Sequence, residues 1–204
     1  MGASVGTDGA ALLKARRGLH PGFRAAVSAD AKITCASRGE RSDLEPGLDT
    51  FLQAVRLAWE SDAFLGQVLY RAKARLQALG VPVLPRLLHR AAMAISQISI
   101  GDPVIVHPGV YIVHGQIVVD GLVEIGSGAV ISPWVTIGLR SGDVVGPTLE
   151  EGVTVGTGAK VLGRLTVGAG GRIGANAVVL QSVEAGETVV GSPARPVSGV
   201  PQEP

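Results

Sequence analysis

The chain has 204 residues, in which 18 Lys and Arg side chains nearly balance 17 Asp and Glu side chains, giving a formal net charge of +1. This balance argues against a nucleic-acid partner or an acidic membrane surface, and no apolar run is long enough to span a bilayer. Cys35 is the single cysteine, so no disulfide can form within the chain, which fits a reducing, cytoplasmic compartment.

Residues 1–43 show little periodicity. They mix Ala, Gly and Ser with basic residues such as Arg16 and Arg24, which predicts a mobile N-terminal tail. Because the segment contains Arg and few acids, a targeting peptide is an alternative. Gly6 stands where a myristoylation signal needs a hydroxyl residue. At the other end, residues 198–204 are predicted to form a short C-terminal tail.

Residues 44–98 are predicted to be helical. The first helix starts near Pro46 and carries an apolar stripe of Leu48, Phe51, Leu52 and Val55. A second helix is capped by Ser61 or Asp62 and stops at Gly80, and a third runs from about Pro85 to Ser96. We expect these helices to cover the open N-terminal end of the domain that follows, because that end exposes unpaired strand edges.

Residues 99–197 are predicted to form one domain, in which an aliphatic residue returns at every sixth position from residue 119 to residue 190, with one gap at Asp143. Neither a helix, with its period of 3.6, nor an ordinary strand, with its period of 2, produces a strict six. Such a period indicates a β-solenoid in which short strands alternate with corners and the aliphatic side chains stack inward. The series reads Val119, Ile125, Ile131, Ile137, Leu149, Val155, Val161, Val167, Ile173, Val179 and Ala185.

The remaining positions of each hexad fit corners. Gly occupies the second position repeatedly, and the fourth position carries Gly128, Gly158, Gly170 or Asn176, residue types that tolerate positive φ. Two places depart from the period. Val119 lies seven residues after Ile112, which puts one extra residue beside His114. Residues 138–148 break the apolar pattern and are predicted to form a loop that leaves the coil, a good place for function.

The repeat region resembles the hexapeptide-repeat acyltransferases, and specifically their serine acetyltransferase branch. The segments that carry the resemblance are YIVHGQIVVDG (111–121), VTIGLRSGD (135–143), EEGVTVGTGAKVLGRLTVGAGGRIGANAVVLQSV (150–183) and VVGSPARPV (189–197). Together they cover about half the chain. The resemblance implies a mainly β fold, a left-handed parallel β-helix of hexapeptide repeats with three hexads per coil, preceded by an N-terminal α-helical region.

The resemblance also implies an activity, the acetyl-CoA-dependent transfer of an acetyl group to a hydroxyl or amine of a small acceptor. His114 matches the family's essential histidine by its setting. Acetyl-CoA, the co-substrate, would lie in a groove between neighbouring β-helices, which implies a homotrimer. The implied contacts are the backbone around Thr157, Gly158, Ala159 and Ala175 for the pantetheine arm, and Lys160, Arg172 and Arg195 for the phosphates.

This chemistry requires few groups. A base must take the hydroxyl proton as the oxygen attacks the thioester, and donors must stabilise the oxyanion that forms. The ordinary pKa of an imidazole, near 6.5, suits His114 for the first role. No metal is required. Asp102 or Asp120 is a candidate to orient His114, and Arg140 and Asp143 in the predicted loop are candidates to contact the acceptor.

Four positions depart from the serine acetyltransferase pattern. Gly146 stands where the family has a second histidine, Val145 where it has an arginine, and Val113 where an aspartate precedes the essential histidine. The aspartate that orients that histidine in the family aligns near Ser99. Since those groups bind the amino acid acceptor or tune the base, their replacement argues against L-serine as the acceptor. A sugar or a small natural-product intermediate is the alternative acceptor.

Two other functions compete with acetyl transfer. A zinc-dependent hydratase of the same fold needs three histidines around one metal ion, and only His107 and His114 lie in the solenoid, seven residues apart. A non-catalytic structural or interaction protein that retained the fold is favoured by the missing second histidine. The intact GTGAKVLG and SPAR segments oppose it.

Overall fold

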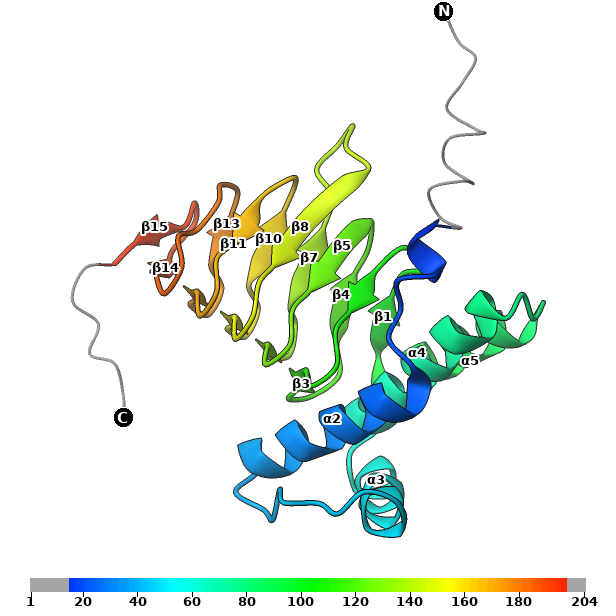
Figure 1. Cartoon of the computed structure of the whole chain (residues 1–204). Coiled ribbons are helices and arrows are strands. Elements are labelled where there is room, and N and C mark those ends of the chain that lie inside the picture. The colour runs from blue at the N-terminus through cyan, green and yellow to red at the C-terminus, as the bar shows by residue number, and fades with distance from the viewer. Residues whose placement is uncertain (1–14, 198–204) are drawn as a thin grey trace, which may run out of the picture.

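A computed structural model describes residues 15–197, which form a helical region and a three-sided parallel β-helix (Figure 1). The predicted fold class is therefore confirmed. The four helices between residues 23 and 96 gather at the N-terminal end of the solenoid, and the coils continue away from them to the C-terminal end. Among the described residues, no helix is both long enough and apolar enough to cross a membrane.

Three helices lie where the sequence predicts them. They are α3 (Leu48–Glu60), α4 (Asp62–Ala78) and α5 (Leu84–Ser96). The Ser61 side chain accepts a hydrogen bond from the Phe64 backbone N–H, which caps α4 as expected. The apolar stripe of α3 does not pack within the chain, since Leu48, Phe51, Leu52 and Val55 are all exposed.

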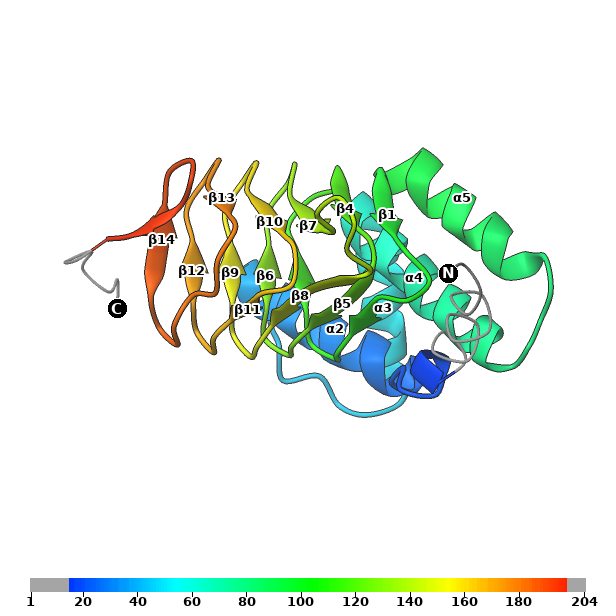
Figure 2. The same ribbon diagram turned by 90° about the horizontal axis from the view of Figure 1, so that it is seen from above.

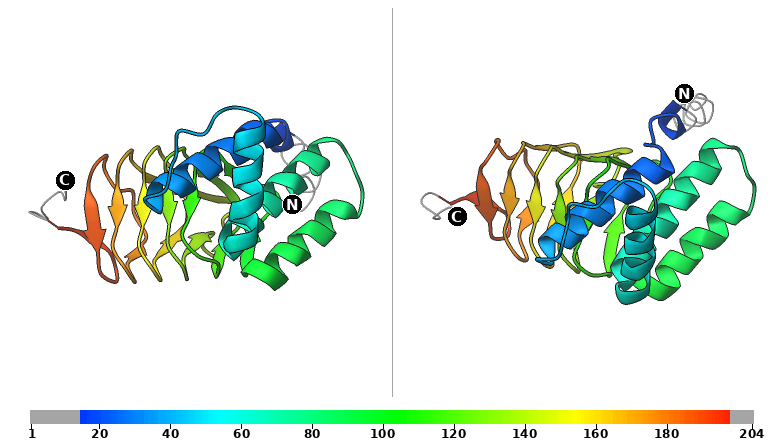
Figure 3. Two further views of the ribbon diagram at one scale, coloured as in Figure 1. Left: turned by 90° about the horizontal axis from the view of Figure 1, so that it is seen from below. Right: turned by 60° about the horizontal axis from the view of Figure 1, so that its bottom comes forward.

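The predicted mobile tail over residues 1–43 is wrong for much of its length. Residues 23–37 form helix α2 (Phe23–Ser37), which lies along one side of the first coils (Figure 3). Its buried residues are small or polar, including Ala26, Asp30 and Ala31, so the helix has no large apolar stripe for a pattern search to find. Residues 1–14 and 198–204, the remainder of the two predicted tails, lie outside the described residues.

The solenoid consists of three sheets, one per side, and each coil contributes a strand to each sheet in turn (Figure 2). Sheet A contains β1 (Ile98–Ile100), β4 (Ile117–Val119), β7 (Thr136–Gly138), β10 (Lys160–Leu162) and β13 (Val178–Val179). Sheet B contains β2 (Ile105–Val106), β5 (Leu122–Ile125), β8 (Val145–Leu149) and β11 (Thr166–Val167). Sheet C contains β3 (Tyr111–Ile112), β6 (Val130–Ile131), β9 (Thr154–Val155), β12 (Arg172–Ile173), β14 (Thr188–Val190) and β15 (Arg195–Pro196).

The strand register explains the period of six. Val119 pairs with Ile137 and Ile137 with Val161, so residues one coil apart stack directly along the axis. The side chains of the aliphatic series are almost completely buried from Val119 to Val179. Ala185 is wrong as the last member, because it is exposed. In sheet B the final coil places Val183 against Val167, a step of 16 residues.

The corners form three edges that run along the solenoid. We call the corner between sheets C and A the C–A edge; it contains residues 113–116, 132–135, 156–159 and 174–177. The A–B edge contains residues 101–104, 120–121, 139–144, 163–165 and 180–182. The predicted loop of residues 138–148 is shorter than expected: it spans 139–144, because Val145 already pairs with Leu122 in sheet B. The third corner is the B–C edge.

Buried polar groups join the helical region to the first coil. The Arg71 guanidinium of α4 donates to both Asp30 carboxylate oxygens, at 2.9 and 3.1 Å, and to the His107 carbonyl at 2.8 Å. Asp30 in turn accepts from the backbone N–H groups of Gly109 and Val110 at 2.9 and 3.1 Å. This pair therefore ties α2 and α4 to the same corner of the solenoid.

The C-terminal end of the solenoid is covered by an antiparallel strand and not by helices. Strand β15 folds back and pairs antiparallel with β14, with Val189 opposite Pro196 and Val190 opposite Arg195. The other named strand pairs of the solenoid are parallel. Sheet C thus ends on a strand that runs antiparallel to the other strands of the sheet (Figure 1).

Candidate active site

The C–A edge repeats one backbone conformation in four successive coils. Gln116, Trp134, Gly158 and Asn176 have φ values of 63°, 65°, 75° and 56°, the left-handed region that a tight corner uses. Backbone hydrogen bonds link these corners along the axis, from Trp134 N–H to Gln116 O at 2.9 Å and from Asn176 N–H to Thr157 O at 2.8 Å. The C–A edge is therefore a regular stack of corners, in which equivalent side-chain positions recur once per coil.

His114 lies at the first corner of the C–A edge. Its side chain is exposed, points away from the solenoid core, and makes no hydrogen bond to any residue between 15 and 197. It lines a cavity of about 540 Å³ between the helical region and the C–A edge, together with Arg38, Glu60, Asp62 and Gln116. An imidazole in this position is free to take a proton from a bound molecule.

Gly115 fixes the position of this corner. A Cβ atom at residue 115 would lie only 1.7 Å from the Ser96 carbonyl oxygen at the end of α5. The helix end and the corner can approach this closely only because residue 115 lacks a side chain. His114 is consequently held at the junction between the helical region and the solenoid.

Most of the predicted thioester contacts lie along the same edge. Thr157 and Ala175 are exposed, they occupy the same corner position in successive coils, and the described backbone hydrogen bonds use neither of their N–H groups. Gly158 lies beside them. Ala159 is fully buried and its N–H already donates to the Gly156 carbonyl, so it offers less to a ligand than predicted. Two free N–H groups on one edge are suitable donors for amide carbonyls.

The three predicted phosphate ligands are spread more widely. Lys160 begins β10 and donates to the Trp134 carbonyl at 2.7 Å. Arg172 is exposed on sheet C in the coil of Ala175, and Arg195 lies on β15 at the end of the solenoid. Coils are spaced about 4.8 Å apart, so His114 and Ala175 are separated by roughly 14 Å along the axis. The candidate residues thus define an extended track along the C–A edge.

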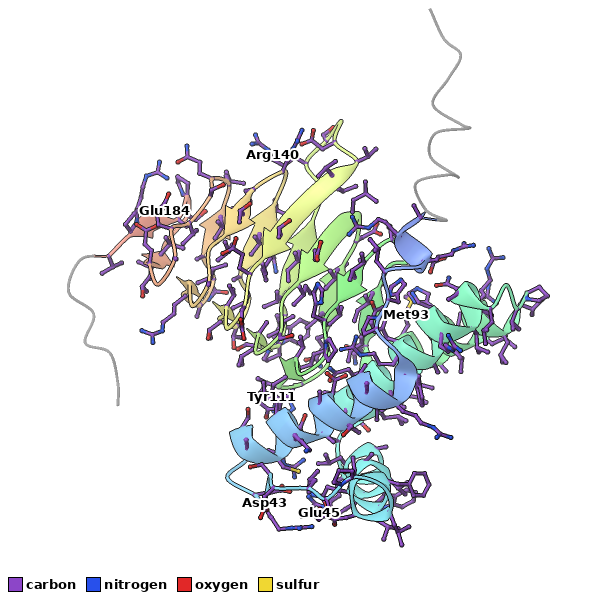
Figure 4. The ribbon with its side chains drawn as sticks, viewed as in Figure 1. Asp43, Glu45, Met93, Tyr111, Arg140 and Glu184 are labelled. Atoms are coloured by element: carbon purple, nitrogen blue, oxygen red, sulfur yellow. The ribbon has the colours of Figure 1, made fainter. Side chains whose placement is uncertain are left out.

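The expectation that Asp102 or Asp120 orients His114 is wrong within one chain. Both aspartates lie on the A–B edge, at the opposite end of the sheet A strands from His114. The loop with Arg140 projects from that edge too. In Figure 4 Arg140 lies on the side of the solenoid away from α2, whereas Tyr111, three residues before His114, faces α2. Arg140 and Asp143 therefore do not reach an acceptor bound at His114 of the same chain.

Sequence reasoning missed the polar residues of the helical region. Asp30 lies in the segment predicted to be a tail, and Arg71 and Lys73 look like ordinary exposed charges of a helix, although both are buried. The one available signal was their spacing from the apolar residues of α4, which places them on the buried face. No cluster of three or more potential metal-ligating side chains occurs in the part of the chain that the structure describes.

Comparison with known proteins gives consistent findings, although no protein-family model matches the sequence. A serine acetyltransferase of Synechococcus elongatus is 39% identical over 147 residues, covering 69% of this chain and 60% of the relative. A serine acetyltransferase of Helicobacter pylori is 37% identical over 167 residues, covering 76% of this chain and 97% of the relative. The crystal structure of a Brucella abortus serine acetyltransferase in complex with coenzyme A has a TM-score of 0.73 at 25% identity, covering 90% of this chain and 70% of that chain.

The parallel β-helix, its helical region and these relatives place the chain among the hexapeptide-repeat acyltransferases, as the sequence motifs indicated. More specifically, it belongs to the serine acetyltransferase family, because it matches nearly the full length of the Helicobacter pylori relative.

Proposed function

We propose that this protein transfers the acetyl group of acetyl-CoA to the hydroxyl group of L-serine or a closely similar small acceptor, with His114 as the general base. The observation that carries the proposal is the placement of an exposed, unpartnered imidazole on the same edge as two free backbone N–H groups, Thr157 and Ala175. The coenzyme A complex of the Brucella abortus relative supports acetyl-CoA as the co-substrate.

The proposed reaction needs only this chain's imidazole and backbone donors. The acceptor oxygen attacks the thioester carbonyl carbon as its proton moves to the unprotonated nitrogen of His114. The resulting oxyanion is stabilised by N–H donors. When the intermediate collapses, the carbon–sulfur bond breaks, and the thiolate of coenzyme A leaves and takes the proton back from the imidazolium. No metal ion enters this scheme.

Sheet A supports the proposal of a homotrimer. Its outward-facing positions carry Val118, Thr136, Leu162 and Val178, and Lys160 is the charged residue among them. An outer face so poor in charge is suited to packing against a second copy of the chain. Because sheet A ends at the C–A edge, such packing would put His114 and the thioester track beside a subunit seam, where the partner's A–B edge would complete the site.

The acceptor is the part of the proposal on which the observations disagree. The names of the relatives support L-serine. Against it, Val145 and Gly146 offer no charge to an amino acid, and a Cβ atom at residue 146 would lie 2.6 Å from the Val123 side chain. This part of sheet B cannot hold a larger residue without a shift. A cationic contact to the acceptor carboxylate must come from elsewhere, and the candidate in the proposed trimer is Arg140 of the partner subunit.

The location we propose is the cytoplasm. Cys35 is buried and unpaired, and a free thiol persists most readily in a reducing compartment.

The decisive experiment measures coenzyme A release from acetyl-CoA with L-serine, other amino acids, sugars and amines as acceptors. We expect release with a hydroxyl amino acid, and a loss of roughly 100-fold or more for His114→Ala, as is usual when a general base is removed. His107→Ala is the matched control, because that imidazole lies on the B–C edge and pairs with Glu124 at 2.7 Å. Full turnover by the His114→Ala protein would remove His114 from this role.

A non-catalytic protein that retained the fold is the second candidate function. The observation that favours it is the lack of any carboxylate bonded to His114 within the described chain. In that case the protein would bind acetyl-CoA along the C–A edge but release no coenzyme A with any acceptor of the panel. Binding without turnover therefore separates the two functions.

A further inference from the structure

A second cavity, of about 760 Å³, shares no lining residue with the cavity at His114. It is formed by the turn between α4 and α5, by one side of α5, and by Gly101 and Asp102 at the start of the A–B edge. We call it the turn pocket. Its volume is in the range of small-molecule sites in proteins. None of the residues proposed above to contact acetyl-CoA lines it.

A buried lysine fixes the carboxylate at the floor of the turn pocket. The Lys73 ammonium donates to the Ile100 carbonyl at 2.6 Å and to Asp102 Oδ1 at 3.1 Å. The Lys73 side chain is only 1% exposed, whereas that of Asp102 is 53% exposed. Burial alone would raise the pKa of Asp102, but hydrogen bonds from Gln77 and Lys73 and the charge of Lys73 bring it below its usual value. Asp102 is thus an oriented anion with one face toward the cavity.

An unsatisfied acceptor lies next to this carboxylate. The Gln77 side-chain oxygen is inaccessible to solvent and has no hydrogen-bond partner among residues 15–197. A buried acceptor without a donor costs free energy. Gln77 lines the turn pocket, but its oxygen is closed to solvent, so Asp102 is the acceptor that the pocket exposes.

The turn pocket also presents hydrogen-bond donors. Arg17 and Arg86 line it, and neither forms an ion pair with a residue of the described chain. His89 lines it too, and burial followed by the charge of Lys73 lowers its pKa, so its ring is neutral at pH 7 and offers one donor and one acceptor. The pocket therefore presents both cations and a carboxylate acceptor.

From this arrangement we propose that the turn pocket binds a small carboxylic acid that also carries an amino or hydroxyl group. The carboxylate would pair with Arg17 and Arg86, and the amino or hydroxyl group would donate to Asp102. A simple anion leaves Asp102 unmatched and meets repulsion from it, while a simple amine leaves the two guanidinium groups unmatched. A ligand that carries both groups matches both kinds of side chain.

The backbone of the turn between α4 and α5 has a strained conformation, which supports a ligand site there. Val83, at the start of α5 and on the pocket wall, has a φ of 64°, which is unfavourable for a β-branched residue. The neighbouring Leu84 N–H donates to the Pro82 carbonyl at 2.7 Å, which closes a very tight turn. Strained residues of this kind are concentrated at ligand sites, where the surrounding contacts hold them.

The test is a binding titration of the full-length protein, by calorimetry, with glycine, glycolate, acetate and ethanolamine. We expect glycine or glycolate to bind, and acetate and ethanolamine to bind at least about tenfold more weakly, because each lacks one of the two groups. Binding of glycine but not glycolate would identify the donor as an amine, and the reverse as a hydroxyl. Equal affinity for acetate, or no binding of any of the four, would overturn the proposal.

Two variants assign the binding to the turn pocket. Arg86→Gln is expected to weaken the ligand by about tenfold, the size of one charge-assisted contact, while Arg90→Gln, an equally exposed change on the same helix, leaves it unchanged. His114→Ala and saturating coenzyme A are also expected to leave the affinity unchanged. An affinity lost with His114→Ala but retained with Arg86→Gln would place the ligand at the C–A edge and refute the turn pocket, whatever the outcome for acetyl transfer.

Discussion

The solenoid and the helical region are stabilised in different ways. In the solenoid the same packing arrangement recurs in every coil. Aliphatic side chains such as Ile131, Ile137 and Val155 stack in register, and each is nearly inaccessible to solvent. The helical region attaches to the first coil through single, dissimilar contacts made by buried polar side chains, among them Arg71, Asp30 and Lys73. A repeated apolar core distributes its stability over many equivalent positions, whereas a polar joint concentrates it in a few.

The largest effect is expected where the joint is broken. Arg71→Ala would leave the buried Asp30 carboxylate without its charged partner, and should lower the free energy of unfolding by about 3–5 kcal/mol. Urea denaturation followed by circular dichroism measures this loss. The double variant Arg71→Met with Asp30→Leu removes both charges and should recover part of it. A single variant as stable as the parent protein would show that the joint does not hold the two regions together.

A smaller effect is expected from pH, through His20. Both ring nitrogens of His20 are buried without a hydrogen-bond partner among residues 15–197, and burial together with the charges of Lys73 and Arg71 lowers its pKa from 6.5 to about 4. The folded state favours the neutral ring, so its contribution is complete above pH 6.5 and is lost as the pH falls toward 4. Because the ring is partly exposed, we expect a loss of about 1–2 kcal/mol.

Denaturation of the parent protein and of His20→Phe on either side of this pH range isolates the effect. The variant cannot be protonated at this position and should lose less stability on acidification. If both proteins lose the same free energy of unfolding on acidification, groups other than His20 cause the loss.

The smallest effect is expected inside the solenoid. Ile137→Val removes one methylene group from a fully buried stack and should cost about 1 kcal/mol, as is typical of this change in a packed core. The same substitution at Ile131, in another sheet, should cost a similar amount, since the two positions are equivalent in the repeat. Very different values from chemical denaturation would show that the coils do not share stability evenly.

The same contrast explains what the sequence could predict. The period of six locates the strands and corners because every coil repeats it, and Ser61 and Pro85 mark helix starts with local chemistry. Helix α2 was missed because its buried residues are Ala, Thr, Cys and Asp, and the burial of Asp30 depends on Arg71, which lies far away in the sequence. Ala185 was misplaced because the last coil is shorter than 18 residues in sheet B, and no local signal marks that change.

For the site, the sequence located His114 but not its surroundings. With three hexads per coil, residues on one edge recur every 18 positions. Asp120, six residues after His114, therefore falls on the next edge, which the period itself could have shown. The turn pocket was beyond prediction, because it depends on how the turn between α4 and α5 packs on Asp102. His89 and His20 both lie near this carboxylate, and neither belongs to a sequence motif that would have marked it.

The reversed strand β15 has a consequence for how these molecules behave at high concentration. A parallel solenoid offers its last coil as an edge against which the last coil of a second chain could pair. An antiparallel strand across one of the three sides breaks that edge, since an incoming coil would have to match two strand directions at once. We therefore expect β15 to oppose such pairing, and its removal to make the chain more prone to self-association through its C-terminal end.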